Sequence, residues 1–407
     1  MAARALIAGL IVGGFGGSVG LPAPTAAGAS ADAGERAEAL LLGGAINRFV
    51  AKQLPTTFSV RGNRDAGIGA EDVTLVDARF CGARDAGHGR FIGLLRPASG
   101  GSAALPALDV GDCRGKLDEV AKRLAAAPDA GAVAAVELIV QWVPSELRVS
   151  IGDIGAGGDG GRSLARTLAR AKAAGPLATV ETGGLRLETE RGSALSLDLA
   201  LSFPKGSDGA LATLTVACPG CAPAPRTPFV TAAGAPADTD GVVGATLRFA
   251  NRVVALFSED GPLVLELDRQ TVEIRNIQIS GGEGTLAVRG RATSRAVSET
   301  ARVSIESAGS DLRLAEVRAD AELEDCNGQS GGASLRCNVR NAARGPAAAA
   351  LAGAMTSRYR GKPLRTLIAP PPFSFEVGGR RMTLRLTPTR ASAAGGNVIV
   401  HGKADVE

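Results

Sequence analysis

The chain has 407 residues, so it can bury a large core and is long enough for two domains. Its 45 Lys and Arg residues nearly balance 41 Asp and Glu residues, the basic residues are scattered, and only 3% of all residues are aromatic. This composition argues against nucleic-acid binding, which needs a concentrated basic surface and usually aromatic stacking. The 55 Gly residues and 45% hydrophobic residues favour turns, twisted strands and aliphatic cores over a helical bundle.

The first 31 residues predict an export signal. A short positive start, MAAR, precedes the uncharged apolar run ALIAGLIVGGFGGSVGL, and Ala29 and Ala31 are small residues suited to signal peptidase. Cleavage near Ala31 predicts a periplasmic or secreted protein. The alternative is an uncleaved membrane anchor, because the run is just long enough to span a bilayer.

The stretch 35–54 predicts a long helix. Its larger apolar residues are Leu42, Ile46, Phe49, Val50 and Leu54. Most of their spacings are three or four, so they form one stripe on a helix, which Pro55 ends. The following stretches TTFSV, VTLVDARF and GRFIGLL predict strands separated by Gly-rich turns, and a short helix is expected at 116–127.

A second helix-and-hairpin unit completes the first half of the chain. The stretch RSLARTLARAKAAG at 162–175 predicts a helix that stops at Gly175-Pro176. The stretch GLRLETERGSALSLDLALSF at 184–203 then predicts a hairpin.

The same order of elements recurs after a Pro- and Ala-rich linker at 222–240. ANRVVALF at 250–257 repeats the Asn-Arg-apolar-Val-Ala pattern of INRFVAKQ at 46–53. The second stripe consists of Val243, Leu247, Ala250, Val254 and Phe257. The predicted elements that follow are the strand LVLEL, the hairpin VEIRNIQISGGEGTLAVRGRA, a helix at 345–361 and the strands FSFEV, MTLRLTP and NVIVHGKADV. The recurrence predicts an internal duplication, with domain A at 32–221 and domain B at 241–407.

Each predicted helix has an apolar stripe and each hairpin has an apolar face, and a helix on a curled sheet buries both. We therefore expect an α+β fold of two related domains, each of long amphipathic helices packed on strongly curved antiparallel β-sheet.

The opening helices AINRFVAKQLPTTFSV and FANRVVALFSEDGPLVLEL carry a family resemblance, together with the closing hairpins VEIRNIQISGGEGTLAVRGRA and MTLRLTPTRASAAGGNVIVHGKADV. In the order and type of elements they resemble the tubular lipid-binding superfamily, which includes the bactericidal/permeability-increasing-protein-like modules. The resemblance implies that helix and curved sheet enclose an acyl chain or another apolar ligand.

An aliphatic interior suits a lipid or similar apolar molecule, because such an interior excludes water and offers few directional polar contacts. The candidate groove residues are Leu42, Ile46, Phe49, Val50, Leu247, Val254 and Phe257. Arg48 and Arg252 lie off the stripes, where they could meet the phosphate of a headgroup. The alternative is that both are solvated or cover apolar surface with their stems.

Six cysteines in an exported chain predict disulfides. Sequence neighbours suggest the pairs Cys81–Cys113, Cys218–Cys221 and Cys326–Cys337, one of fifteen connectivities. The CPGC loop that holds Cys218 and Cys221 could instead be a redox dithiol or half of a zinc site. Prolines follow it, so no helix begins there to lower a thiol pKa, and only His88 and His401 could help complete a zinc site. This context favours a structural disulfide.

The sequence shows no convincing catalytic centre, and we expect no cofactor and no metal. GQSGG around Ser330 has the letters of a nucleophile elbow, but the following ASLRCNV predicts a strand where an elbow needs a helix. The leading hypothesis is an exported, non-enzymatic binding protein for a lipid or other apolar ligand. The alternatives are a cell-envelope structural or adaptor protein with filled cores and an envelope protein partner, and a thiol oxidoreductase that uses CPGC.

Overall fold

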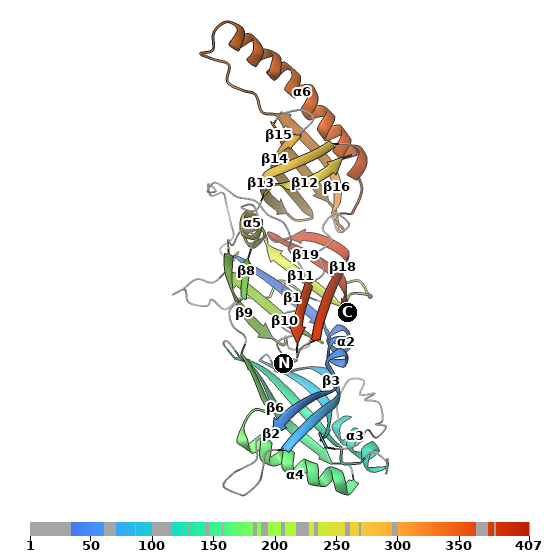
Figure 1. The fold of residues 1–407 in the computed structure, drawn as a ribbon. Helices are drawn as coiled ribbons and strands as arrows, with labels where there is room; N and C mark the ends of the chain where they lie inside the picture. Colours follow the sequence, from blue (N-terminus) through green and yellow to red (C-terminus); the bar gives the residue numbers. More distant parts are fainter. Residues whose placement is uncertain are drawn as a thin grey trace.

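Three antiparallel sheets follow one another along an elongated molecule (Figure 1). This computed structural model describes residues 34–406 except 61–70, 86, 100–115, 128–130, 144–145, 157, 182–184, 189–193, 205–207, 217–227, 232–234, 257–260, 268–269, 295–299, 364–372 and 378–379. The predicted export signal therefore lies outside the described residues.

The middle sheet has eight strands, contributed by both halves of the chain. In spatial order they are β17 (Phe373–Val377), β18 (Arg380–Ala394), β19 (Asn397–Val406), β11 (Gly241–Thr246), β1 (Arg36–Leu42), β10 (Gly209–Val216), β9 (Ala194–Ser202) and β8 (Leu185–Glu188). The first strands of the two halves, β1 and β11, pair at the centre, with Leu40 opposite Val242. The halves are thus joined by a continuous ladder of backbone hydrogen bonds.

A six-stranded sheet forms one end of the molecule. Its strands are, in order, β2 (Thr56–Val60), β3 (Glu71–Asp85), β4 (His88–Pro97), β5 (Ala134–Val143), β6 (Glu146–Ala156) and β7 (Ala178–Glu181). Helices α2 (Gly43–Gln53) and α4 (Gly158–Ala174) pack on one face, which we call the inner face. Helix α3 (Lys116–Ala125) packs on the other face through Val120 and Leu124.

A five-stranded sheet forms the other end. Its strands are β12 (Leu263–Leu267), β13 (Gln270–Gly282), β14 (Thr285–Ser294), β15 (Thr300–Ala308) and β16 (Arg313–Ala321). The short helix α5 (Leu247–Leu256) precedes it, and the long helix α6 (Gly332–Tyr359) follows it. Met355 of α6 packs against Ile274 and Val303 of the sheet, while the first turns of α6 extend beyond the strands (Figure 1).

The order of elements repeats along the chain. The first half runs β1, α2, the end-sheet strands with α3 and α4, then β8 to β10. The second half runs β11, α5, the other end sheet, α6, then β17 to β19. The recurrence seen in the sequence therefore corresponds to two chain halves that each supply one end sheet and part of the middle sheet. The domain boundaries at 221 and 241 stay a prediction.

The predicted α+β fold of long helices on curved sheets is wrong, because the fold is mostly β. In the described residues, strands contain far more residues than helices, and α2 and α5 span only 11 and 10 residues. The error has the same cause in both halves. The runs 36–42 and 241–246 are strands at the centre of a sheet and are buried on both faces, so neither run shows the strict apolar–polar alternation of a half-buried strand.

The structure also corrects the prediction for the region after β16. Helix α6 begins at Gly332 and runs for 28 residues through Pro346, whereas the sequence predicts a strand at 333–339 and a helix only from 345. Predicted hairpins elsewhere are confirmed as β8–β9, β13–β14 and β18–β19, and the predicted short helix is confirmed as α3. Hairpins and short helices depend on local turn and period signals, whereas the start of α6 is held by a disulfide and by polar contacts with the preceding segment.

Candidate functional site

The inner face of the six-stranded sheet carries the largest apolar cluster in the described chain. Strand residues alternate between faces, so every second residue of β5 and β6 points inward. Buried members from the strands include Val73, Leu75, Val136, Leu138, Leu147 and Ile151. Helix α4 adds Leu164 and Leu168, α2 adds Ile46 and Phe49, and Phe203 closes the side toward the middle sheet.

At the edges of the sheet, some apolar side chains that pack against this cluster are partly exposed to solvent. Apolar side chains that pack against it but stay partly exposed are Leu54, Phe58, Trp142, Val149 and Leu177. Phe58 lies on the edge strand β2, and Leu177 directly precedes the opposite edge strand β7. The half-exposed residues therefore form an apolar rim that is continuous with the buried cluster.

Charged side chains gather instead on the opposite face of the same strands. In the sequence of β5, Glu137 lies between two residues that point inward, so its buried side chain points to the opposite face. Its carboxylate lies 2.6 Å from Nε of Arg90 and 3.8 Å from Nη1 of Arg84. It also accepts a hydrogen bond from the backbone N–H of Asp153. The charged groups of this region thus pair with one another away from the inner face.

The structure brings together only some of the predicted groove residues. Ile46 and Phe49 are 1% and 4% exposed, so they fill the cluster, and Val50 packs against it at partial exposure. Leu42 belongs to β1 and packs with the middle sheet, and Leu247 packs with Leu286 and Leu312 in a separate cluster. Val254 is half-buried on α5, and Phe257 lies outside the described residues.

The two candidate headgroup arginines lie in different surroundings. Nη2 of Arg48 lies 2.7 Å from a carboxylate oxygen of Asp240 and donates to the carbonyl of Ala404 at 3.3 Å. It therefore ties α2 to the middle sheet. Arg252 is exposed on α5.

The Asn of the repeated Asn-Arg motif has the same role in both halves. Oδ1 of Asn47 accepts a hydrogen bond from the backbone N–H of Phe80 on β3 at 2.6 Å. Asn251 both accepts from the N–H of Ile279 and donates to its carbonyl on β13, each at 2.7 Å. The side chain thus anchors each short helix to the second strand of the following sheet. The sequence shows the repetition, but the partners are 33 and 28 residues away.

We expect Asn251→Ala to lower the free energy of unfolding by about 2 kcal/mol, because it leaves a backbone N–H and a carbonyl without their partner. Asn47→Ala should cost about 1–2 kcal/mol. Arg252→Ala replaces the exposed neighbouring residue and should change the free energy of unfolding by no more than about 0.5 kcal/mol. Urea denaturation of the three variants measures this, and equal values for N251A and R252A would refute the anchoring role.

A buried ion pair lies on the central strand β1. Glu38 is 2% and Arg36 is 5% exposed, with 3.6 Å between Nε of Arg36 and Oε1 of Glu38. Oε2 of Glu38 accepts hydrogen bonds from the backbone N–H groups of Phe229 and Val230. Burial raises the pKa of Glu38, although these hydrogen bonds and Arg36 act in the opposite direction. This pair was not predicted from the sequence, where its signal is two charges at alternate positions in an otherwise apolar strand.

The two histidines do not form a catalytic site with Ser330. Nδ1 of His88 lies 2.6 Å from the carboxylate of Asp85 in an exposed turn of the six-stranded sheet. His401 is buried on β19, opposite Val242 of β11. Ser330 is exposed between β16 and α6. A helix does follow it, contrary to the prediction, but β16 ends at Ala321, so no strand runs directly into a nucleophile elbow.

His401 predicts a pH-dependent stability. Burial, and then the charge of Arg390, lower the pKa of His401 below its usual value. As the pH falls below about 6.5, the unfolded chain therefore takes up a proton that the folded chain does not, and the free energy of unfolding decreases. His401→Gln should remove this part of the slope, whereas His88→Gln should keep it. Urea denaturation from pH 8 to pH 5 compares them, and equal slopes for wild type and H401Q would contradict the assignment.

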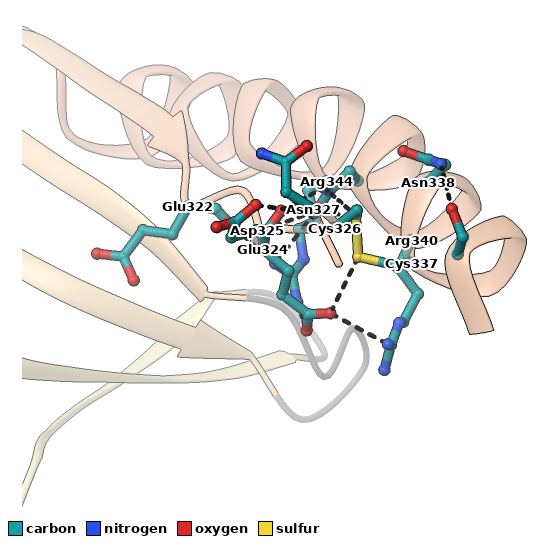
Figure 2. Close-up of a disulfide and its surroundings, with 11 residues drawn as sticks. Glu322, Glu324, Asp325, Cys326, Asn327, Cys337, Asn338, Arg340 and Arg344 are labelled. Atoms are coloured by element: carbon teal, nitrogen blue, oxygen red, sulfur yellow. Dashed lines mark hydrogen bonds and ion pairs between the residues drawn. A yellow bond between two sulfur atoms is a disulfide. The ribbon is translucent and has the colours of Figure 1, made fainter. Parts of the chain in front are cut away.

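The predicted disulfide Cys326–Cys337 is confirmed, and it joins the segment after β16 to the first turns of α6 (Figure 2). Cys81 is also disulfide-bonded. Cys113, Cys218 and Cys221 lie outside the described residues, so the CPGC hypotheses stay open.

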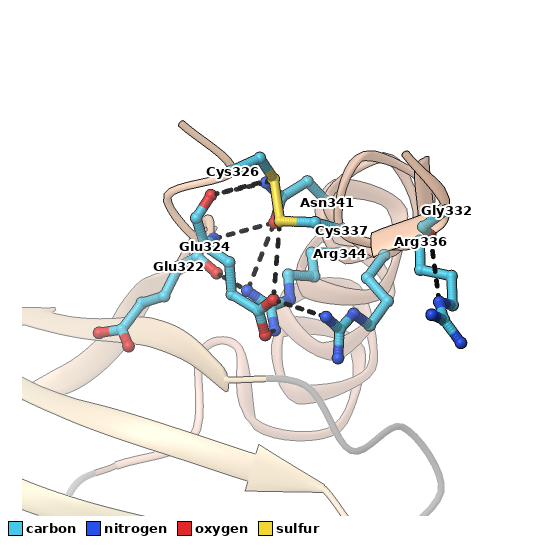
Figure 3. A network of polar contacts seen from close by, with 9 residues as sticks. Glu322, Glu324, Cys326, Gly332, Arg336, Cys337, Asn341 and Arg344 are labelled. Carbon is cyan, nitrogen blue, oxygen red and sulfur yellow. Dashed lines mark hydrogen bonds and ion pairs between the residues drawn. A yellow bond between two sulfur atoms is a disulfide. The ribbon is translucent and has the colours of Figure 1, made fainter. Parts of the chain in front are cut away.

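Polar contacts centred on Glu324 reinforce this disulfide (Figures 2 and 3). The buried Arg344 donates to Oε1 of Glu324 at 2.6 Å and to the carbonyl of Glu322 at 2.7 Å. Asn341 accepts from the N–H of Glu324 and donates to its carbonyl, both at 2.9 Å, and Nη2 of Arg340 lies 3.1 Å from Oε2. One face of α6 is thereby held to the preceding segment.

Within the described ranges, no three His, Cys, Asp or Glu side chains gather in a way that could hold a metal ion. No helix of the described chain combines the length and apolarity needed to cross a membrane.

The sequence matches no family model, and no curated protein matches it. Two solved structures are similar over 91% of the chain. The crystal structure of P47 of Clostridium botulinum E1 has 7% sequence identity, a TM-score of 0.34 and 99% of its own chain covered. The structure of P47 from Clostridium botulinum A2 has 8% identity, a TM-score of 0.32 and 97% covered. A likeness this weak assigns neither a family nor a function.

Proposed function

We propose that the protein is a non-enzymatic binding protein for a lipid or another elongated apolar molecule, which it holds on the inner face of the six-stranded sheet. The observation that carries this proposal is the apolar rim. Phe58, Trp142 and Val149 stay partly exposed although they are continuous with a large buried apolar cluster. Exposed apolar surface next to a core costs free energy in water, and a bound alkyl chain would remove that cost.

The distribution of charge supports the same assignment. The charged residues of β4 and β5, Arg90 and Glu137, pair on the other face of the sheet. An apolar ligand on the inner face would therefore meet few groups that demand water. Arg48 is engaged with Asp240, so we do not assign it to a headgroup. Export, as predicted from residues 1–31, and the resemblance to tubular lipid-binding proteins remain part of this proposal.

The second candidate function is that of an adaptor protein with filled cores. The near-complete burial of Ile46 and Phe49 favours it, since these predicted groove residues are already covered by the protein itself. In that case the rim would be an ordinary sheet edge, and a protein would be the partner.

Native mass spectrometry of the exported chain, compared with the same sample denatured, tests the proposal. We expect a mass excess that disappears on denaturation and that extraction identifies as a lipid. Val149→Asn places a polar side chain on the rim and should reduce the bound fraction severalfold, since burying its amide costs about 1–3 kcal/mol.

Thr179→Asn is the matched control. Thr179 is exposed opposite Arg148, one register position away from Val149, on the outer face of the sheet. The control should carry as much ligand as the wild type. An apo mass for the wild type, or equal ligand loss in both variants, would reject the inner face as the site and favour the adaptor function.

A further inference from the structure

The first turns of α6 form an end of the molecule that carries exposed large apolar side chains. Leu335 and Val339 on α6 are 67% and 61% exposed, and Leu323, in the segment between β16 and α6, is 66% exposed. Leu335 and Val339 are four residues apart, so they lie on one side of the helix. In Figure 1 this part of α6 projects past the five-stranded sheet, at the opposite end from the six-stranded sheet.

The apolar side continues along the helix without a charged residue. The exposed residues that follow at helical spacing are Ala342, Ala343, Pro346, Ala349, Ala350 and Gly353. From Leu335 to Gly353 this strip is about 27 Å long at 1.5 Å per residue. Together with Leu335 and Val339 it forms a convex ridge, which we call the α6 ridge.

Contacts on the other side of the helix keep the α6 ridge exposed. Cys337 is bonded to Cys326, and Arg344 is buried against Glu324 (Figure 3). Further along, Ala348 and Met355 are buried at the same side of the helix. Since these residues lie at helical spacing opposite Leu335 and Val339, the ridge cannot turn toward the core without breaking the disulfide and the polar network.

The charges of α6 are all of one sign. Its charged residues are Arg336, Arg340, Arg344 and Arg358, and its sequence contains no Asp or Glu. Arg336 follows Leu335 directly, is exposed, and donates to the helix carbonyl of Gly332, which is a contact with a neutral group.

The acidic residues of the neighbouring segment offset this charge only in part, at Arg340 and Arg344. Arg291 and Arg302 hold the carboxylate of Glu322 at 2.7 and 3.1 Å. Arg340 and Arg344 hold that of Glu324, and the carboxylate of Asp325 accepts the N–H of Asn327.

We propose that the α6 ridge docks on the surface of a bilayer that contains anionic lipids. A helix with aliphatic residues on one side and arginine beside them is the arrangement of interfacial helices, which insert their apolar side between headgroups and pair their cations with lipid phosphates. The ridge is convex and its exposed large side chains are aliphatic, whereas protein interfaces are enriched in aromatic residues. A bilayer, which adapts to a convex surface, is therefore the favoured occupant. The proposal goes beyond the ligand site and does not depend on it.

Flotation with phosphatidylcholine vesicles, with and without phosphatidylglycerol, tests this docking. Wild type should float with phosphatidylglycerol vesicles and detach as salt is raised. The double variant Leu335→Ser and Val339→Ser should bind at least about tenfold more weakly, because two aliphatic side chains no longer leave water. Arg336→Gln should weaken binding to the anionic vesicles about fivefold and leave binding to pure phosphatidylcholine unchanged.

Arg79→Gln is the control for charge, since Arg79 is exposed on β3 in the six-stranded sheet and the change in net charge is the same. It should bind like wild type. Leu335→Trp adds a reporter whose emission should shift to the blue on vesicles, measured against the background of Trp142. Circular dichroism and thermal melts establish that each variant is folded.

Failure of the wild type to float at low salt would overturn the proposal. So would wild-type flotation by the folded L335S/V339S variant, which would indicate another contact surface. The outcome is separable from the proposed function, because L335S/V339S should lose vesicle binding and still show the bound mass in native mass spectrometry.

Discussion

Glu38→Ala is expected to lower the free energy of unfolding by about 3–5 kcal/mol, more than we expect for any other single substitution. The change leaves the buried Arg36 without its carboxylate at the centre of the middle sheet. It also removes the acceptor of the Phe229 and Val230 N–H groups, which hold the segment before β11 against β1. The loss of a carboxylate partner from a buried guanidinium and the loss of the acceptor of two N–H groups each destabilise a folded chain.

Two variants separate the charge from the hydrogen bonds. Glu38→Gln keeps a side-chain oxygen that can accept the two N–H groups but loses the charge that faces Arg36, so we expect an intermediate loss of about 1–3 kcal/mol. Glu35→Ala, at a partly exposed position just before β1, should change stability by no more than about 0.5 kcal/mol. Urea denaturation gives all three values. If E38A were as stable as E35A, the buried pair would have no role in joining the two halves.

Replacing both Cys326 and Cys337 with Ser should lower the free energy of unfolding by about 3 kcal/mol. The disulfide spans a sequence separation of 11, and a closed loop of this size restricts the unfolded chain by about that amount in the chain-entropy model. Substitution is the appropriate test because reductant would also act on the disulfide of Cys81. Hydrogen exchange should show the first turns of α6 opening more often in the variant.

Arg340→Ala provides the control for this variant at the same place. Arg340 pairs with the same Glu324 but is 55% exposed, so its loss should cost no more than about 1 kcal/mol. If hydrogen exchange of α6 in the Cys-to-Ser variant were the same as in the wild type, the Glu324 contacts alone would hold the helix. In the vesicle experiment, the Cys-to-Ser variant should bind vesicles more weakly than the wild type if docking needs the α6 ridge to be held in place.

Several elements could be predicted from the sequence because their signals are local. The turn Gly281–Gly284 between alternating strands predicts the β13–β14 hairpin, and the short helix expected at 116–127 is α3. The pair Cys326–Cys337 was predicted from closeness in sequence, and it forms because the chain turns back within eleven residues. The repeated Asn-Arg pattern was visible, but nothing in it indicated hydrogen bonds to Phe80 and Ile279.

The helical prediction failed where burial on both faces removes the strand period. Residues 36–42 and 243–246 were assigned to helices, yet β1 and β11 lie at the centre of eight strands. A strand buried on both faces lacks strict alternation, as in the consecutive Leu40, Leu41 and Leu42 of β1, and such a short apolar run fits a helix equally well. Only the partner strands, some two hundred residues away, decide between the two.

The sequence by itself determined the local elements: the hairpins, the short helices, the repeated order and the near neighbours in a disulfide. Only the tertiary structure decided that both halves share one sheet, that Glu38 meets Phe229 and Val230, and that α6 leaves Leu335 and Val339 exposed. The reason is that turn chemistry and hydrophobic period act over a few residues, whereas strand pairing and buried charge depend on segments that meet only after the chain has folded.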